Sequence, residues 1–344
     1  WRLVPGSTAV DTNAKPYGWR AGRRAVDDHL RRVGIAGVAV RGRIPGTYRV
    51  HRDLDPATTV SIIIPTRGGS GTVWGRRRCF VVEAVRSALA NTAHRNLEIV
   101  VVADTATPPA VIRELGEIAD DRLVLVDFVE PFNFSRKCNA GYLAARGEVL
   151  LFLNDDVEVI TDGWLEALVA PLAEPDVGLV GAKLLYSDGS VQHGGHLYER
   201  HGFTHAFHGS PADSRAGFSA LQLDREVTGV TAACVAIRRE TFAQVGGFCA
   251  GLPGNFNDVD FCFKIRKAGF RILALAQVEL FHFESRSREP RVYAWEEDVT
   301  FGRWGSADID EYLPHRSGRI NNPPGEPPRR RLNGYSVNAQ WPPA

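Results

Sequence analysis

The chain has 344 residues, a formal net charge of +1 at pH 7 and 44% hydrophobic residues. This length suits one large α/β domain or two small ones, and the near-neutral charge excludes a global field that would draw nucleic acid. No apolar run approaches the roughly 18–20 residues that span a bilayer. We therefore expect a cytoplasmic protein without a transmembrane segment, and peripheral contact with the inner face of the membrane stays open.

Residues 1–58 are expected to form a basic N-terminal extension or linker. They contain one helix candidate, "AVDDHLRRVGI", followed by "RIPGTYRV", in which Pro-Gly predicts a turn before a short strand. The main domain is expected to begin after this segment, at residue 59.

Strands and helices alternate from residue 59 to residue 158. Apolar, β-branched runs predict buried strands at 59–66, 97–104, 122–128 and 148–155. Apolar residues at helical spacing predict a helix in "CFVVEAVRSALANT", and a second helix is predicted at 135–147 with Ser135 as its N-cap. The stretch "RGGSGTVWGRRR" is expected to be a glycine-rich loop. This order predicts a mostly parallel sheet with helices on both faces.

Polar residues stand where three of the predicted parallel strands end. They are Pro65 and Thr66, then Asp104, then Asn154 to Asp156. Ligands of such sheets bind outside the carboxyl ends of the strands, so we expect these residues to gather along one edge. Adjacent carboxylates repel each other unless a cation lies beside them, and a hard divalent cation with oxygen ligands meets that need. A turn or a helix cap would also place acids here.

The second half is more mixed. Strands are predicted in "VGLVGAKLLY" and "SVQHGGHLY", followed by a loop in "HGFTHAFHGSPADSRAGFS". A strand and short helix are predicted in "VTGVTAACVAIRRETFAQVGGF", a helix in "FNDVDFCFKIRKAGF", and a strand in "RILALAQVELFHFESRSR". Five histidines between residues 193 and 208 lack the spacing of a compact zinc site, so a role in lining an acceptor groove is favoured.

Two acids begin the predicted helix in "FNDVDFCFKIRKAGF". Asp258 lies in the first turn, where it is either a capping acid or a carboxylate kept ionised as a general base. Asp260 is four residues before Lys264, which favours an ion pair along the helix. Because residues two apart point about 200° apart around a helix, the two acids should not share one site.

A histidine ends the last predicted strand. His282 precedes Arg286 and Arg288 in a polar loop. An imidazole beside guanidinium groups suggests a metal ligand next to an anion clamp, which suits a diphosphate.

These segments together resemble glycosyltransferase family 2, inverting enzymes with the GT-A fold, and most of all members that build bacterial polysaccharides. The resemblance covers about residues 59–290, including "VSIIIPTRG", "EIVVVAD", "NFSRKCNAGYLAARGEVLLFLNDDVEV", "VGLVGAKLLYSDGSVQHGG", "NFNDVDFCFKIRKAGFRI" and "LFHFESRSR". It implies an α/β GT-A domain at 59–290, with a nucleotide-sugar-binding half at 59–158 and a mixed acceptor-side half at 159–290. Residues 291–344 are then a C-terminal extension with a Pro-rich tail.

The resemblance also implies a role for individual residues. Asp156 and His282 would bind Mg²⁺ or Mn²⁺ at the donor diphosphate, and Asp258 would be the catalytic base. The donor-binding residues it implies are Pro65, Thr66, Asp104, Lys137, Asp155 and Arg286, with Asp104 at the base, Asp155 on the ribose side and Lys137 or its neighbour Arg136 at phosphate. Asn154 and Asn257 depart from the family pattern, which has acids there.

The implied reaction is metal-dependent, inverting transfer of a hexosyl or deoxyhexosyl group from a UDP- or dTDP-sugar to an acceptor hydroxyl. A growing cell-surface glycan or a lipid-linked acceptor is expected, and no nucleic acid. Two alternatives stay open. Asn154 and Asn257 would also fit a catalytically silent nucleotide- or sugar-binding module of a larger protein. A sugar-nucleotide pyrophosphorylase is less favoured, because "PTRGGSGT" lacks the lysine that its phosphate loop needs.

Overall fold

A computed structural model of the protein describes residues 16–199, 202–283, 291–305, 310–313 and 336–338. Arg286 and Arg288, expected to contact the donor diphosphate, lie outside these ranges, as do His201 and most of the Pro-rich tail. Among the described residues, no helix combines the length and apolarity needed to cross a bilayer.

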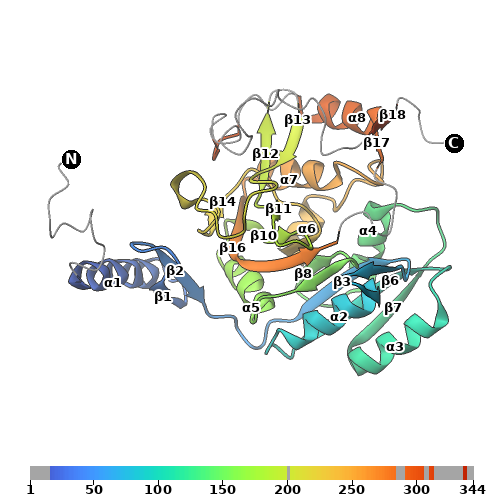
Figure 1. Ribbon diagram of the computed structural model, residues 1–344, viewed down its shortest axis with the longest axis horizontal. Helices are drawn as coiled ribbons and strands as arrows, with labels where there is room; N and C mark the ends of the chain where they lie inside the picture. The colour runs from blue at the N-terminus through green and yellow to red at the C-terminus, as the bar shows by residue number, and fades with distance from the viewer. Residues whose placement is uncertain (1–15, 200–201, 284–290, 306–309, 314–335, 339–344) are drawn as a thin grey trace.

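A ten-stranded sheet forms the centre of the molecule (Figure 1). Its order is β14 (Arg225–Glu226), β16 (Arg271–His282), β10 (Val177–Leu185), β15 (Cys234–Arg238), β8 (Val149–Leu153), β3 (Val60–Thr66), β6 (Leu97–Asp104) and β7 (Leu123–Phe128), while β11 (Val191–His193) pairs with β10 and β9 (Val157–Val159) with β16. β8, β3, β6 and β7 are parallel, and β15 runs antiparallel to both of its neighbours. The predicted mostly parallel sheet is confirmed.

Helices cover both faces of the sheet. α2 (Phe80–Ala90), α3 (Pro109–Ala119) and α5 (Trp164–Val169) share one apolar cluster with Ile62 and Ile64 of β3. α4 (Phe134–Ala144), α6 (Arg239–Gln244) and α7 (Asn257–Lys267) share another with Ile63, whose side chain points to the opposite face. Because both faces are covered, all seven residues of β3 are buried, as its unbroken apolar run predicts.

Four local features differ from the sequence predictions. The glycine-rich loop contains a hairpin of β4 (Ser70–Val73) and β5 (Arg76–Cys79), and α3 lies in a stretch where no helix was expected. The predicted loop after residue 200 contains β13 (Gly202–His205), which pairs with β12 (His196–Glu199). The N-cap of α4 is Asn133, whose side chain accepts a hydrogen bond from the backbone N–H of Arg136, so Ser135 lies inside the first turn.

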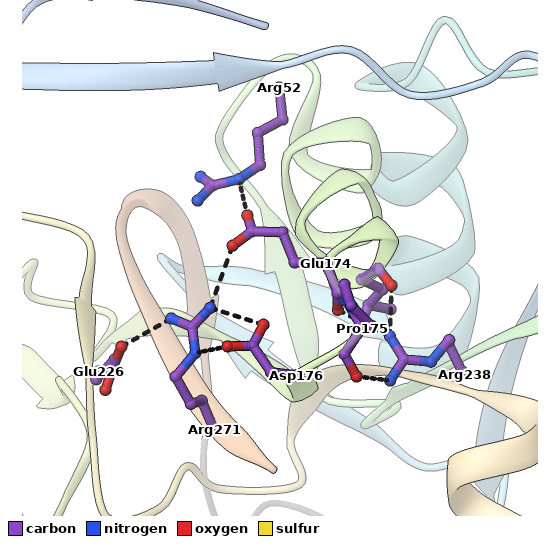
Figure 2. A network of polar contacts seen from close by, with 8 residues as sticks. Arg52, Glu174, Pro175, Asp176, Glu226, Arg238 and Arg271 are labelled. Atoms are coloured by element: carbon purple, nitrogen blue, oxygen red, sulfur yellow. Dashed lines mark hydrogen bonds and ion pairs between the residues drawn. The ribbon is translucent and has the colours of Figure 1, made fainter. Parts of the chain in front are cut away.

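The N-terminal segment forms a small unit of its own. α1 (Pro16–Val33) packs on the hairpin of β1 (Gly37–Arg41) and β2 (Tyr48–Arg52), and this unit projects to one side of the main body (Figure 1). Figure 2 shows its connection to the sheet: Arg52 Nε donates to Glu174 Oε1 at 2.6 Å, and Glu174 also binds Arg271 of β16 at 3.2 Å. Arg271 in turn binds Asp176 and Glu226.

Among the described C-terminal elements, the helix packs against α7. These elements are β17 (Arg291–Tyr293), α8 (Ala294–Trp304) and β18 (Ser336–Asn338), with β17 and β18 paired in parallel. Asp260 Oδ1 accepts hydrogen bonds from Arg303 Nη1 at 2.7 Å and Trp304 Nε1 at 2.9 Å. Short 3₁₀ turns at Asp120–Arg122, Ala170–Ala173 and Gly217–Ser219 complete the described elements.

Candidate active site

A cavity of about 230 Å³ opens at the carboxyl ends of β3 and β8. Its lining includes most of the predicted site residues: Pro65, Thr66, Lys137, Asp155, Asp156, Asp258 and His282. Asp104 does not line it, but two residues that do, Lys137 and Arg67, bind its carboxylate. The strand-end residues thus gather along one edge of the sheet, as expected from the topology.

Thr66 connects two of these strand ends. Its Oγ1 donates to Asp155 Oδ2 at 2.6 Å, and its carbonyl accepts from Lys137 Nζ at 2.9 Å. The same ammonium lies 2.5 Å from Asp104 Oδ1. Burial lowers the pKa of Lys137, and the neighbouring Asp104 opposes this shift. Lys137 can reach so far into the sheet because Gly141 lets α4 approach: a Cβ there would lie 2.4 Å from Ile63 Cγ2.

Asp155 and Asp156 are both buried at the end of β8. Burial raises the pKa of the Asp155 carboxyl to about 7, and the charge of Asp156 adds to the effect, while the hydrogen bond from Thr66 opposes it. Two adjacent buried carboxylates therefore resist ionising together, which is the electrostatic condition that a bound cation relieves.

His282 meets Asp156 through strand pairing. β9 and β16 are antiparallel with Val157 opposite His282, which places His282 Nε2 3.2 Å from Asp156 Oδ1. His282 Nδ1 lies 2.6 Å from Gln192 Oε1. Because an amide oxygen only accepts, Nδ1 carries the proton, and Nε2, beside Asp156, is able to accept from Asn154 Nδ2 at 3.2 Å. Gln192 was missed in the sequence, although a polar residue in an apolar strand was the available signal.

The residues around Asp156 and His282 fit a divalent cation. Asn154 Oδ1 is buried beside them without a hydrogen-bond partner in the described part of the chain. The described residues contain no group of three or more His, Cys, Asp or Glu side chains placed to hold a metal. A carboxylate and an imidazole suffice only where substrate oxygens and water complete the coordination, as is usual for Mg²⁺.

Asp258 faces the same cavity from the first turn of α7. Its Oδ1 accepts from the Val259 N–H at 2.9 Å, and its Oδ2 accepts from the Ala232 N–H at 3.4 Å. Burial alone would raise the pKa of Asp258, but His196, followed by His205, outweighs it and holds the pKa well below its usual range. The carboxylate is thus ionised at neutral pH.

Asp260 points away from Asp258, as the helix spacing predicts. Its Oδ2 lies 3.4 Å from Lys264 Nζ, which confirms the expected ion pair, and its Oδ1 binds α8. In the histidine-rich segment, His193 Nε2 accepts from the Thr231 N–H at 3.1 Å and its Nδ1 lies 2.6 Å from His205 Nδ1, so both ring nitrogens of His193 are engaged. His196 and His205 line the cavity.

The glycosyl transferase family 2 model matches residues 61–246. The chain is 39% identical over 295 residues to the uncharacterized protein y4gI of Sinorhizobium fredii (strain NBRC 101917 / NGR234), covering 84% of this chain and 31% of the relative. It is 34% identical over 303 residues to the O-antigen biosynthesis protein RfbC of Myxococcus xanthus, covering 86% and 23%. The chain therefore spans less than a third of the length of these relatives.

The fold is similar to that in the crystal structure of GalNAc-T7 with UDP, GalNAc and Mn²⁺. The TM-score is 0.52 at 16% sequence identity, over 66% of this chain and 43% of that one. At this identity the likeness concerns the fold. Together with the family match over more than half of the chain, it shows that the protein is a member of glycosyl transferase family 2 with the GT-A fold.

Proposed function

We propose that the protein catalyses metal-dependent, inverting transfer of a sugar from a nucleotide-diphosphate sugar to an acceptor hydroxyl. The observation that carries this proposal is the placement of the Asp156–His282 pair and the ionised Asp258 on one cavity at the carboxyl edge of the sheet. The Asp156–His282 pair suits a cation that binds a diphosphate. The Asp258 carboxylate suits removal of a proton from the acceptor.

The donor is bound by the strand-end residues. We assign the nucleoside-base position to Asp104, whose carboxylate lies beside the cavity and is bound by Lys137 and Arg67, and the ribose side to Asp155, which accepts from Thr66. Lys137 is engaged with Asp104 and the Thr66 carbonyl, so it orders the nucleoside side of the site. A divalent cation, when bound by Asp156 and His282, supplies positive charge that stabilises the departing diphosphate.

Asp258 accepts the proton of the acceptor hydroxyl. The acceptor oxygen then bonds to the anomeric carbon from the face opposite the leaving group, while the bond from that carbon to the diphosphate oxygen breaks and its electron pair leaves with the nucleotide. Configuration inverts, and one base is sufficient because no glycosyl-enzyme intermediate forms. A second carboxylate acting as nucleophile is not required.

The substrate classes rest on the relatives. The GalNAc-T7 structure contains UDP and Mn²⁺, and RfbC is named for O-antigen biosynthesis. We extend these to a UDP- or dTDP-sugar donor, a hexosyl or deoxyhexosyl group, and an acceptor that is a cell-surface glycan or its lipid-linked precursor.

A thermal-shift panel of UDP, dTDP and GDP, each with and without Mn²⁺, tests the donor site. A ligand that binds only the native state raises the melting temperature, so we expect a Mn²⁺-dependent rise with UDP or dTDP. Asp156→Asn should abolish the Mn²⁺ dependence. A protein whose melting temperature responds to none of the nucleotides would contradict the proposal. Nucleotide binding without release of nucleotide from any sugar donor would favour a catalytically silent module.

A further inference from the structure

His196 and His205 form a pair of imidazoles beside Asp258. β12 and β13 are antiparallel with His196 directly opposite His205, so both side chains lie on the same face of the hairpin, with ring centroids 5.7 Å apart. His196 is buried, and it nevertheless borders the cavity. Its Nε2 lies 3.7 Å from Asp258 Oδ2, within reach of an ion pair.

The proton positions on His196 follow from its second neighbour. Tyr198 is buried, and burial raises its pKa well above the usual range, so its phenol stays protonated. The Tyr198 hydroxyl lies 3.4 Å from His196 Nδ1 and is placed to donate to it. With Nδ1 accepting from Tyr198, the proton that His196 can offer to Asp258 is the one on Nε2.

The surrounding backbone is shaped for this arrangement. The His196 N–H donates to the Gly229 carbonyl at 2.7 Å. A Cβ at Gly229 would lie 2.6 Å from Tyr198 Oη and 2.7 Å from His196 Nδ1, so any other residue would displace this pair. His196 is not itself placed as the base, because one ring nitrogen faces Tyr198 and the other faces Asp258.

We propose that His196 is a positioning residue that donates from Nε2 to Asp258, keeping the carboxylate ionised and its orientation fixed while it accepts the acceptor proton. The distance of 3.7 Å is longer than a hydrogen bond, and catalytic hydrogen bonds of ligand-free sites commonly shorten when substrate binds. This inference rests on the proposed transferase function, in which Asp258 is the base.

Two variants of His196 separate this role from packing. His196→Gln places an amide N–H close to the position of Nε2, whereas His196→Phe fills the space without a donor. The matched control is His94→Phe: His94 is also buried, and its Nε2 contacts the Thr58 carbonyl at 2.9 Å, beyond the amino end of β3 and away from the cavity.

The measurement is the release of nucleoside diphosphate from UDP- and dTDP-sugars with Mn²⁺, with water or added glycan as acceptor. We expect His196→Phe to lower kcat about 10- to 100-fold, as loss of a supporting hydrogen bond typically does, with the KM for donor unchanged. His196→Gln should recover most of this kcat, and His94→Phe should keep the wild-type kcat. UDP–Mn²⁺ thermal shifts verify that each variant folds and binds nucleotide.

Wild-type kcat in His196→Phe would overturn the inference, and so would equal losses in the Phe and Gln variants, which would assign the effect to packing. If the wild type releases nucleotide from none of the donors, the proposed function itself is contradicted. The inference about His196 then fails with it. The two failures are therefore distinguishable.

Discussion

Glu296 Oε1 accepts a hydrogen bond of 2.8 Å from the backbone N–H of Asn255, two residues before α7 begins. The same oxygen accepts from the Gly254 N–H, and Oε2 accepts from the Asn255 side chain at 2.6 Å. The carboxylate is fully buried. It therefore fixes the turn through Phe256, whose φ of 55° is unusual for a large side chain, and with it the direction from which Asp258 enters the cavity.

Glu296→Gln should destabilise the protein by about 1.5–3 kcal/mol, because an amide donor replaces one oxygen of a charged acceptor that several donors surround. Urea unfolding measures the loss. We also expect kcat for transfer to fall more than nucleotide affinity, since the turn leads directly into the helix that carries Asp258. An unchanged free energy of unfolding would show that the hydrogen bonds from Gly254 and Asn255 to Glu296 contribute nothing measurable to stability.

Asp258→Asn should keep Mn²⁺-dependent nucleotide binding and lose transfer by at least about 10²-fold, the lower range for removing a general base. Isothermal titration with UDP and Mn²⁺ provides the binding control. Asp260→Asn is the control, because Asp260 lies in the same helix but faces α8. It tests whether removing any carboxylate charge from α7 is enough to reduce transfer. Transfer at the wild-type rate in Asp258→Asn would exclude Asp258 as the base.

Gln192→Leu should weaken Mn²⁺ binding in the presence of UDP about 10- to 100-fold, because the Oε1 that holds the His282 Nδ1 proton is lost. Gln192→Glu retains an acceptor at this position and should bind Mn²⁺ at least as tightly as the wild type. Titration of Mn²⁺ followed by electron paramagnetic resonance gives both affinities. Equal Mn²⁺ affinity in the Leu variant and the wild type would contradict the assigned orientation of His282.

The stability of the protein should fall in mild acid partly through His193. Burial, then His205 and His196, hold the pKa of His193 well below its ordinary value of 6.5. Below pH 6.5 the unfolded chain therefore binds a proton that the folded protein does not, so stability is full above this pH and decreases as the pH falls. Between pH 7.5 and 5.5 this one group accounts for up to about 1.4 kcal/mol, the value for a folded-state imidazole that stays neutral over the whole interval.

The comparison for this prediction is His193→Gln, whose side-chain oxygen can still accept from the Thr231 N–H. We expect this variant to be less stable at pH 7.5 and to lose less stability than the wild type on acidification. Urea unfolding at both pH values measures the difference. Parallel losses in the two proteins would assign the acid sensitivity to other groups.

The sequence alone predicts the buried half of the sheet well. Expected strands at 59–66 and 97–104 correspond to Val60–Thr66 and Leu97–Asp104, because each is an apolar run bounded by polar residues and covered on both faces. Because these strands are parallel, their carboxyl ends, and the polar residues that follow them, lie at the same edge of the sheet. Their roles as ligands or base remain predictions.

The hairpin of β4 and β5 could not be predicted in the same way. Its turn is Trp74-Gly75, with φ of 48° and 75°, whereas the usual signal of such a turn is Asn-Gly or Asp-Gly. Trp74 is held by distant contacts: its Nε1 donates to the Ser187 carbonyl at 2.8 Å, and its ring packs on Phe281 and Phe283. Tertiary packing therefore imposes a turn that the local sequence does not specify.

The supporting residues of the site were out of reach for a related reason. Gln192, His196 and Glu296 act on residues that lie 90, 62 and 41 positions away in the chain, and each meets its partner only through sheet pairing or helix packing. Short motifs identify residues at strand ends and helix starts. They contain no information about which distant side chain fixes a histidine tautomer or a turn.

The ion-pair network of Figure 2 bears on where this member of glycosyl transferase family 2 can be shortened for study. A shortened protein beginning at residue 59 would keep every strand of the ten-stranded sheet and still lose Arg52, one of the two guanidinium groups that bind the Glu174 carboxylate in the described part of the chain. Glu174 is largely buried, so its negative charge would then be balanced by Arg271 without Arg52. An expression boundary placed before α1 preserves this junction, whereas one drawn at the first strand of the sheet removes it.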